Sequence, residues 1–292
     1  MADQIANYLR VAYTDLVMNQ ADISGSILMS DCTVKDNVDG TKTSFGYMGT
    51  FNLVPKPSRH APTPDGDLLH RLYWATLAPF HNNIMLDETD DKAAFTSPKS
   101  EYVQKGSGAI GRAWDTMIAS AAIADTAYGV AGASTEDWSA YTDRNAHSHV
   151  VAAAGGVPNL SDVLKMRRIF QECDVTGPLF AWVSPQYMEA FLLITEVKSS
   201  DFNEGKVLVE GSLGYFAGFN WKVTNSLPKT GTTRSCIFGC PGVVGLAKSI
   251  NKKVRIDERT DLSYAWQVYF EICGGGARRD PERVIEHSFT EV

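Results

Sequence analysis

Two long stretches of the chain carry regular patterns of apolar and polar residues. Between 98 and 124, apolar residues recur every three or four positions, which predicts one long helix of roughly 40 Å at ~1.5 Å per residue. Ser97 and Pro98 stand where an N-cap and a first helical proline are favoured. From 262 to 273 apolar and polar residues alternate strictly, which predicts a strand about twice the usual length of ~5–6 residues. A helix and a strand this long indicate an elongated unit.

Residues 44–86 are typical of a long hairpin. Its limbs, "SFGYMGTFNLV" and "LLHRLYWATLAPFHNNIML", are apolar on both faces. The connection "PKPSRHAPTPDGD" contains four prolines and excludes regular structure. Because an isolated two-stranded hairpin is only marginally stable, this one needs cover from its own domain or from a neighbouring chain.

The remaining segments predict an arm and a compact unit. Residues 1–43 combine a short helical pattern with polar, turn-rich sequence and indicate an arm. The stretch "NLSDVLKMRRIFQE" predicts a second helix, capped by Ser161 or Asn159. From Leu179 onward short strands and helices alternate, which is typical of a compact α+β unit; the segments are "LFAWV", "SPQYMEAFLLI", "FNWKVTN", "SCIFG" and "VVGLA".

Composition excludes several classes of protein. The 292 residues have a formal net charge of −7 and no long basic run, which disfavours tight nucleic-acid binding through a basic surface. No apolar run approaches the ~20 residues that cross a bilayer, and the N-terminus lacks the regions of a signal peptide. The five dispersed cysteines predict free thiols in a reducing cytosol.

One glycine-rich stretch matches a cofactor-binding motif, but the residues around it do not fit that motif. Gly106, Gly108 and Gly111 fit the G-x-G-x-x-G dinucleotide fingerprint, and Asp125 follows 19 positions after the first glycine. The fingerprint needs a buried strand before it and a second strand ending at the acidic residue. Here a polar, helix-like segment precedes it, and the 13 residues before Asp125 are helix formers. The glycines are therefore predicted to lie inside a helix, where another element passes close by.

The other chemistry-bearing patterns are also incomplete. His147 and His149 form H-x-H, but no further Cys or His lies near in sequence, so loop or surface histidines are favoured over a metal site. Cys236 and Cys240 lack a second pair and are predicted to be buried thiols. The run "GGGARRDP" superficially resembles a phosphate cradle, yet no helix start follows, which favours a strand end and a hinge. The sequence predicts no enzyme, no cofactor and no metal.

The order of these elements resembles that of tailed-phage major capsid proteins of the Hong Kong 97 (HK97)-like fold. The stretch "IMLDETDDKAAFTSPKSEYVQKGSGAIGRAWDTMIASAAIADTA" is similar to the run through the spine helix in one branch of that family, including an Arg-x-x-Asp pair, here Arg112 and Asp115. Downstream, three further segments resemble central-domain and return segments: "FAWVSPQYMEAFL", "GYFAGFNWKVTNSLP" and "VGLAKSINKKVRIDERTDLSYAWQVYFEICGGGARRDPERVI". The resemblance covers about residues 44–288.

The resemblance implies an α+β shell subunit with a definite division of the chain: an N-terminal arm (1–43), an E-loop hairpin (44–86), a spine helix with the first part of the P-domain (87–156), an A-domain (157–252) and return strands of the P-domain (253–292). The hairpin would lie over a neighbouring subunit, which explains its apolar character. The acidic net charge fits a shell that encloses double-stranded DNA without specific binding.

The resemblance also implies partners and a location. Copies of the chain would form the pentamers and hexamers of a virion capsid, assembled in the bacterial host cytoplasm. A separate scaffolding protein and a portal are expected, a decoration protein is allowed, and no membrane is involved. Two alternatives stay open: a cellular encapsulin-like nanocompartment shell protein, and a dinucleotide-binding enzyme built on residues 104–125.

Charge along the hairpin suggests one assembly contact. The predicted tip carries Lys56, Arg59 and His60, and an acidic cluster lies at its base, formed by Asp87, Glu88, Asp90 and Asp91. Head-to-tail packing could pair the tip of one subunit with the acidic cluster of the next. A calcium loop at the cluster is disfavoured because the glycine and distal glutamate are missing. For Arg112 and Asp115 the spacing allows either a helix-surface ion pair or an anchor to the P-domain sheet.

Overall fold

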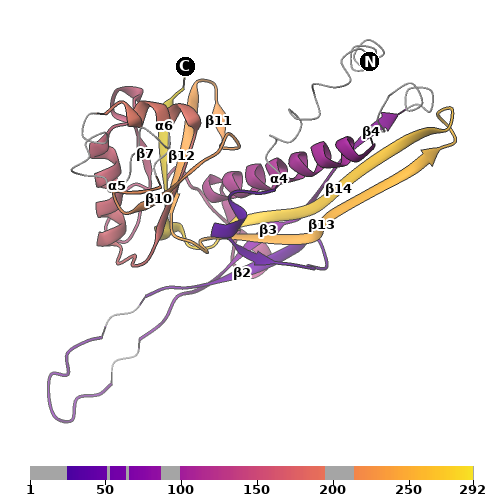
Figure 1. Ribbon diagram of the computed structural model, residues 1–292. Coiled ribbons are helices and arrows are strands. Elements are labelled where there is room, and N and C mark those ends of the chain that lie inside the picture. The colour runs from indigo at the N-terminus through magenta and orange to yellow at the C-terminus, as the bar shows by residue number, and fades with distance from the viewer. Residues whose placement is uncertain (1–24, 51–52, 64–65, 87–98, 195–213, 292) are drawn as a thin grey trace.

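The computed structural model describes residues 25–50, 53–63, 66–86, 99–194 and 214–291. For residues 99–104, at the start of the long helix, it describes the backbone alone. The described chain forms an elongated unit, a compact unit and a projecting hairpin (Figure 1). In the described part no helix has the length and apolar character needed to cross a membrane.

The elongated unit is a four-stranded sheet with one long helix along it (Figure 1). Its strand order is β1 (Thr33–Lys35), β13 (Val244–Arg259), β14 (Ala265–Arg278) and β4 (Ala78–Leu86). The helix α4 (Lys99–Ile123) lies along β14, with 25 residues or roughly 37 Å at ~1.5 Å per residue. The predicted long helix is confirmed within the described residues; Ser97 and Pro98 lie outside them.

Glycines allow α4 to approach β14 closely. A Cβ on Gly106 of the helix would stand 2.1 Å from the Phe270 ring of the strand. Farther along the strand, a Cβ on Gly274 would stand 2.5 Å from the Trp114 ring. A Cβ on Gly276 would stand 2.6 Å from Cβ of Ala121. Small and large residues thus alternate between the two elements, so that each ring fills the space above a glycine.

The compact unit is built on a seven-stranded sheet. The strand order is β7 (Val150–Ala152), β15 (Val284–Thr290), β12 (Thr233–Gly239), β8 (Leu179–Val183), β10 (Phe219–Val223) and β9 (Tyr215–Phe216), with β11 (Lys229–Thr230) beside β12. Helices α5 (Leu160–Glu172) and α6 (Pro185–Leu192) pack on one face, because Phe170 contacts Phe219 and Tyr187 contacts Trp221, two positions apart on β10.

Helix caps follow the sequence closely in this unit. Asn159, one of the two predicted cap residues, accepts a hydrogen bond from the amide of Asp162 at the start of α5. Ser184 accepts from the amide of Tyr187 at the start of α6, and Pro185 occupies the first helical position.

A third sheet carries the projecting hairpin. It has the order β2 (Lys42–Met48), β3 (His70–Thr76), β5 (Thr126–Tyr128) and β6 (Ser134–Glu136). We use the name projecting hairpin for β2, β3 and the chain between them, which extends far from both units (Figure 1). Four short 3₁₀ turns complete the described elements: η2 (Met29–Asp31), η3 (Val130–Gly132), η4 (Ala154–Gly156) and η5 (Pro281–Arg283).

Three expectations about strands need correction. The second limb of the predicted hairpin is two strands, because the chain leaves the hairpin sheet after Thr76 and β4 pairs with β14 instead. The predicted strand at 262–273 begins only at Ala265; Leu262 and Tyr264 lie in the exposed turn before it. The stretch "VVGLA" is the start of the 16-residue strand β13 of the elongated unit, not a short strand of the compact one.

The glycine run at 274–276 is neither a phosphate cradle nor the end of a strand. It lies inside β14, which continues to Arg278. Gly274 and Gly276 face α4, and a Cβ on Gly275, which points to the opposite side, would stand 2.1 Å from the carbonyl oxygen of Thr76. The run therefore lets a helix and the end of β3 approach one strand from two sides.

Candidate functional site

The projecting hairpin is the most exposed apolar feature of the described chain. Leu53 is 89% exposed and Val54 is 67% exposed, and Met48 and Leu69 at its base are also exposed. Apolar side chains held this far from the body are typical of a surface that a partner covers. The part of the hairpin that needs to be covered by other residues is therefore its outer part.

The basic residues predicted at the tip are exposed there. Lys56, Arg59 and His60 lie in the outer part of the hairpin. The acidic residues predicted to receive them, Asp87, Glu88, Asp90 and Asp91, lie outside the described residues. The pairing of tip and acidic cluster therefore stays a prediction.

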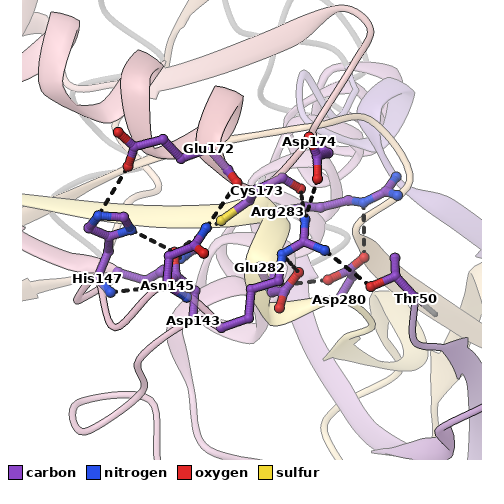
Figure 2. A network of polar contacts seen from close by, with 12 residues as sticks. Thr50, Asp143, Asn145, His147, Glu172, Cys173, Asp174, Asp280, Glu282 and Arg283 are labelled. Carbon is purple, nitrogen blue, oxygen red and sulfur yellow. Dashed lines mark hydrogen bonds and ion pairs between the residues drawn. The ribbon is translucent and has the colours of Figure 1, made fainter. Parts of the chain in front are cut away.

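Two arginines fix the base of the projecting hairpin. Arg279 donates from Nε to the carbonyl of Gly46 on β2 at 2.9 Å. Arg144 donates to the Thr50 hydroxyl at 3.1 Å, to the Cys173 carbonyl and to the Asp174 carboxylate at 3.1 Å; Figure 2 labels these three partners. These contacts tie the hairpin to the end of α5 and so set the direction in which it projects.

Asp280 lies near this base and has a perturbed pKa. Burial raises the pKa of Asp280 to about 6, and the Arg283 guanidinium, whose Nε lies 2.9 Å from the carboxylate, lowers it only in part. The Asp280 side chain also accepts from the amide of Glu282 and caps η5.

Asp115 anchors the start of the described chain, residues 26–28 of the arm. Its buried carboxylate accepts hydrogen bonds from the amides of Ile27 at 3.2 Å and Leu28 at 3.1 Å, and from the Ser26 hydroxyl. Arg112 is exposed on another side of α4, and the structure gives no ion pair between these two described residues. Neither form of the Arg112–Asp115 contact expected from the sequence is present; Asp115 holds the arm segment, not the sheet.

The G-x-G-x-x-G stretch lies inside α4, as its context predicted. Gly106 faces Phe270, and a Cβ on Gly111 would stand 2.3 Å from the carbonyl oxygen of Gly25. Gly108 is buried as well. Two of the three glycines therefore serve close packing, one against β14 and one against the arm segment.

Both histidines lie in the loop before β7, as the sequence predicts, but His149 is fully buried there. The fold brings its side chain together with Asp143 and Cys173, and one ligand atom from each of the three lies within 4.8 Å of the others. The sequence did not reveal this cluster, because Cys173 follows α5 and lies far from His149 along the chain. The only signal was the crowding of Asp143, His147 and His149 in one short loop.

The remaining cysteines fit their prediction. All five are free thiols, and Cys236 and Cys240 are buried. Burial raises the pKa of Cys236 to about 12, which leaves it an unreactive thiol.

Three features together define a shell-forming subunit of the HK97-like type. They are a spine helix along the long strands β13 and β14, a compact α+β unit, and a projecting apolar hairpin. The family model described as phage capsid protein matches residues 5–291, and the chain belongs to that family. A comparison with curated protein sequences finds no match.

Solved capsids share the fold. The capsid structure of the cyanophage P-SCSP1u is similar with a TM-score of 0.70 at 15% identity, covering 93% of this chain and 90% of that one. The mature capsid of bacteriophage PhiM1 gives 0.63 at 13% identity, covering 92% and 89%. The capsid of a native GTA particle gives 0.61 at 14% identity, covering 92% and 93%.

Family and fold agree on the function. The chain is a major capsid protein, a structural protein that self-assembles into the shell of a phage particle. The compartment-shell and dinucleotide-enzyme alternatives are not favoured, since the family match spans nearly the whole chain and the glycine fingerprint lies within a helix.

Proposed function

We propose that copies of this chain form the pentamers and hexamers of an icosahedral capsid, with the projecting hairpin of each subunit lying over its neighbour. The exposure of Leu53 and Val54, far from the core of their own chain, is the observation that carries the proposal. Covering such side chains on a neighbour supplies a driving force of about 25 cal/mol per Å² of apolar surface. The shell encloses double-stranded DNA without specific binding, which the net charge of −7 supports.

The finer parts of this function follow from the same class of protein. The subunit carries out no catalytic reaction, assembles in the cytoplasm of the bacterial host, and works with a separate scaffolding protein and a portal. The division into arm (1–43), E-loop (44–86), spine (87–156), A-domain (157–252) and return strands (253–292) is part of this proposal. The elements support it in outline, although β7 and β15 join the sheet of the compact unit from outside 157–252.

Electron microscopy of the expressed protein tests the hairpin. Leu53→Ser with Val54→Ser should abolish or sharply reduce closed shells, while the circular dichroism spectrum stays that of the parent chain. Val130→Ser is the matched control, because Val130 is 88% exposed but lies outside the hairpin. Shells of normal number and size from the double variant would contradict the proposal.

The charged tip is proposed to set the register between neighbours. Reversing Lys56 and Arg59 to Glu should impair assembly, most strongly at low salt, where surface charges are least screened. Reversing Asp87 and Glu88 to Lys in the same chain should restore it. Normal assembly of the Lys56→Glu, Arg59→Glu variant at low salt would remove this part of the proposal while leaving the hairpin itself untouched.

A further inference from the structure

A buried cluster of metal-ligand residue types lies where the loop before β7 meets the end of α5. Asp143, His147 and His149 come from this loop, and Cys173 is the C-cap residue of α5. Figure 2 shows Asp143, His147 and Cys173 pointing toward one another, with Glu172 behind the ring of His147. The ligand atoms of Asp143, His149 and Cys173 all lie within 4.8 Å of one another, and all three residues are buried.

The two oxygens of Asp143 have different surroundings. Oδ1 accepts hydrogen bonds from the amides of Asn145 and His147, both at 2.8 Å, which fixes the carboxylate in the turn. Oδ2 instead faces three side chains: Cys173 Sγ at 3.0 Å, His147 Nδ1 at 3.1 Å and His149 Nε2 at 3.4 Å. One oxygen thus shapes the loop, and the other stands at the centre of the cluster.

The hydrogen-bond partners of the His149 ring indicate that a cation is favoured between this ring and Asp143. Its Nδ1 lies 2.6 Å from the carbonyl oxygen of Val284, which can only accept, so Nδ1 carries the proton. In neutral imidazole the other nitrogen then has a lone pair, and this lone pair faces the Asp143 carboxylate oxygen. Two electron pairs pointing at each other in a buried place are unfavourable unless a positive charge lies between them.

His147 has the same arrangement. Its Nε2 lies 3.0 Å from Glu172 Oε2 and its Nδ1 lies 3.1 Å from Asp143 Oδ2, so both nitrogens face acceptors. A neutral ring can donate to only one of them. Metal-bound histidines commonly donate their second nitrogen to a carboxylate or to a backbone carbonyl. Val284 provides such a partner for His149, and Glu172 and Asp143 hold the ring of His147 beside the cluster.

We propose that Asp143, His149 and Cys173 bind a zinc-class divalent transition metal ion through one ligand atom each. Zinc takes Cys, His and carboxylate ligands in four-coordinate sites, with bonds of about 2.0–2.3 Å. Tetrahedral bonds of that length separate the ligand atoms by roughly 3.3–3.6 Å, and Asp143 Oδ2 lies 3.0 Å from Cys173 Sγ and 3.4 Å from His149 Nε2, close to this range. The sulfur and imidazole donors select against Mg²⁺ and Ca²⁺, which prefer oxygen.

Binding would release one proton and leave the redox state unchanged. The Cys173 thiol loses its proton to solvent as the sulfur–metal bond forms, while His149 binds as a neutral imidazole and Asp143 as a carboxylate. The site would have three protein ligands and a fourth position left for water. It would clamp the 143–149 loop to the end of α5, beside Arg144, which holds the base of the projecting hairpin.

Metal content and a cobalt spectrum test the site in the full-length protein. We expect about one zinc ion per chain by mass spectrometry after purification without chelator. After EDTA treatment and dialysis, Co²⁺ should give visible ligand-field bands and a near-ultraviolet thiolate-to-cobalt band that saturate at one equivalent, and zinc should abolish both. Protein that purifies without zinc and gives no saturable cobalt spectrum would overturn the proposal.

Matched variants assign the ligands. Cys173→Ser should lose the thiolate-to-cobalt band, and His149→Asn should weaken zinc binding more than a hundredfold. Cys273→Ser changes a thiol outside the cluster and should bind as the parent does. Since a ligand variant could fold poorly, the cobalt spectrum of the unaltered chain decides independently. Parental affinity and spectrum in the Cys173→Ser variant would overturn the assignment.

Discussion

The ring of Phe270 on β14 lies directly over Gly106 of α4, so close that a Cβ on the glycine would stand 2.1 Å from two ring atoms. Helix propensity alone would favour alanine at this position by about 1 kcal/mol. The contact explains why glycine stands there, since the helix must lie close to the strand along much of its length.

Gly106→Ala should therefore destabilise the protein. Overpacking costs about 1–3 kcal/mol and outweighs the gain in helix propensity. Gly46→Ala is the control, because a Cβ on Gly46 meets nothing within 4 Å. Urea unfolding followed by circular dichroism should show a lower midpoint for the first variant and a change within about 0.5 kcal/mol for the second. An unchanged or higher midpoint for Gly106→Ala would show that the ring moves aside freely.

Removing the Asp115 carboxylate should release the arm segment from α4. In Asp115→Ala, the amides of Ile27 and Leu28 lose their acceptor, at a cost of about 1–3 kcal/mol for each buried group left unpaired. Limited proteolysis should then cut near residues 25–32 more rapidly than in the parent. Arg112→Ala, an exposed change on the same helix, should leave the cleavage rate unchanged; equal rates in both variants would remove the anchor role.

Arg278 should prove critical for the end of α4. It is fully buried, donates to the carbonyls of Ala122 at 3.0 Å and Ala124 at 2.9 Å, and lies over the Trp138 ring at 4.1 Å. Because lysine lacks the planar fork, Arg278→Lys cannot make all three contacts and should lower the thermal midpoint by several degrees. Arg255→Lys, which changes an exposed arginine on β13, is the control. A shift no larger than that of the control would show that charge alone suffices.

Asp280 should make stability depend on pH between about 4 and 6. Its folded pKa of about 6 lies above the ordinary value of 3.8, so the folded state binds the proton more tightly than the unfolded state. This contribution is fully present below about pH 3.8 and is lost as the pH rises through 6, by up to about 3 kcal/mol. Asp280→Asn, which keeps an acceptor for the Glu282 amide, should flatten the unfolding midpoint over this range. Parallel pH profiles for the two proteins would contradict the assignment.

The sequence by itself determined the long helix, the length of the return strand to within a few residues, the cap of α5 to one of two residues, and the apolar hairpin. It also determined that the G-x-G-x-x-G stretch lies inside a helix, because a polar, helix-like segment precedes it and helix formers follow it. These features depend on periodicity and on neighbours a few residues apart, which report local backbone geometry.

Only the tertiary structure decided which distant residues meet. Phe270 explains Gly106, Ile27 and Leu28 explain the burial of Asp115, and the meeting of His149 with Cys173 and Val284 creates the metal-ligand cluster. The division of the second hairpin limb at Leu77 is of the same kind, since β4 leaves the hairpin sheet to pair with β14. Such contacts depend on how whole elements pack, and a local pattern of apolar and polar residues is the same whichever partner lies opposite.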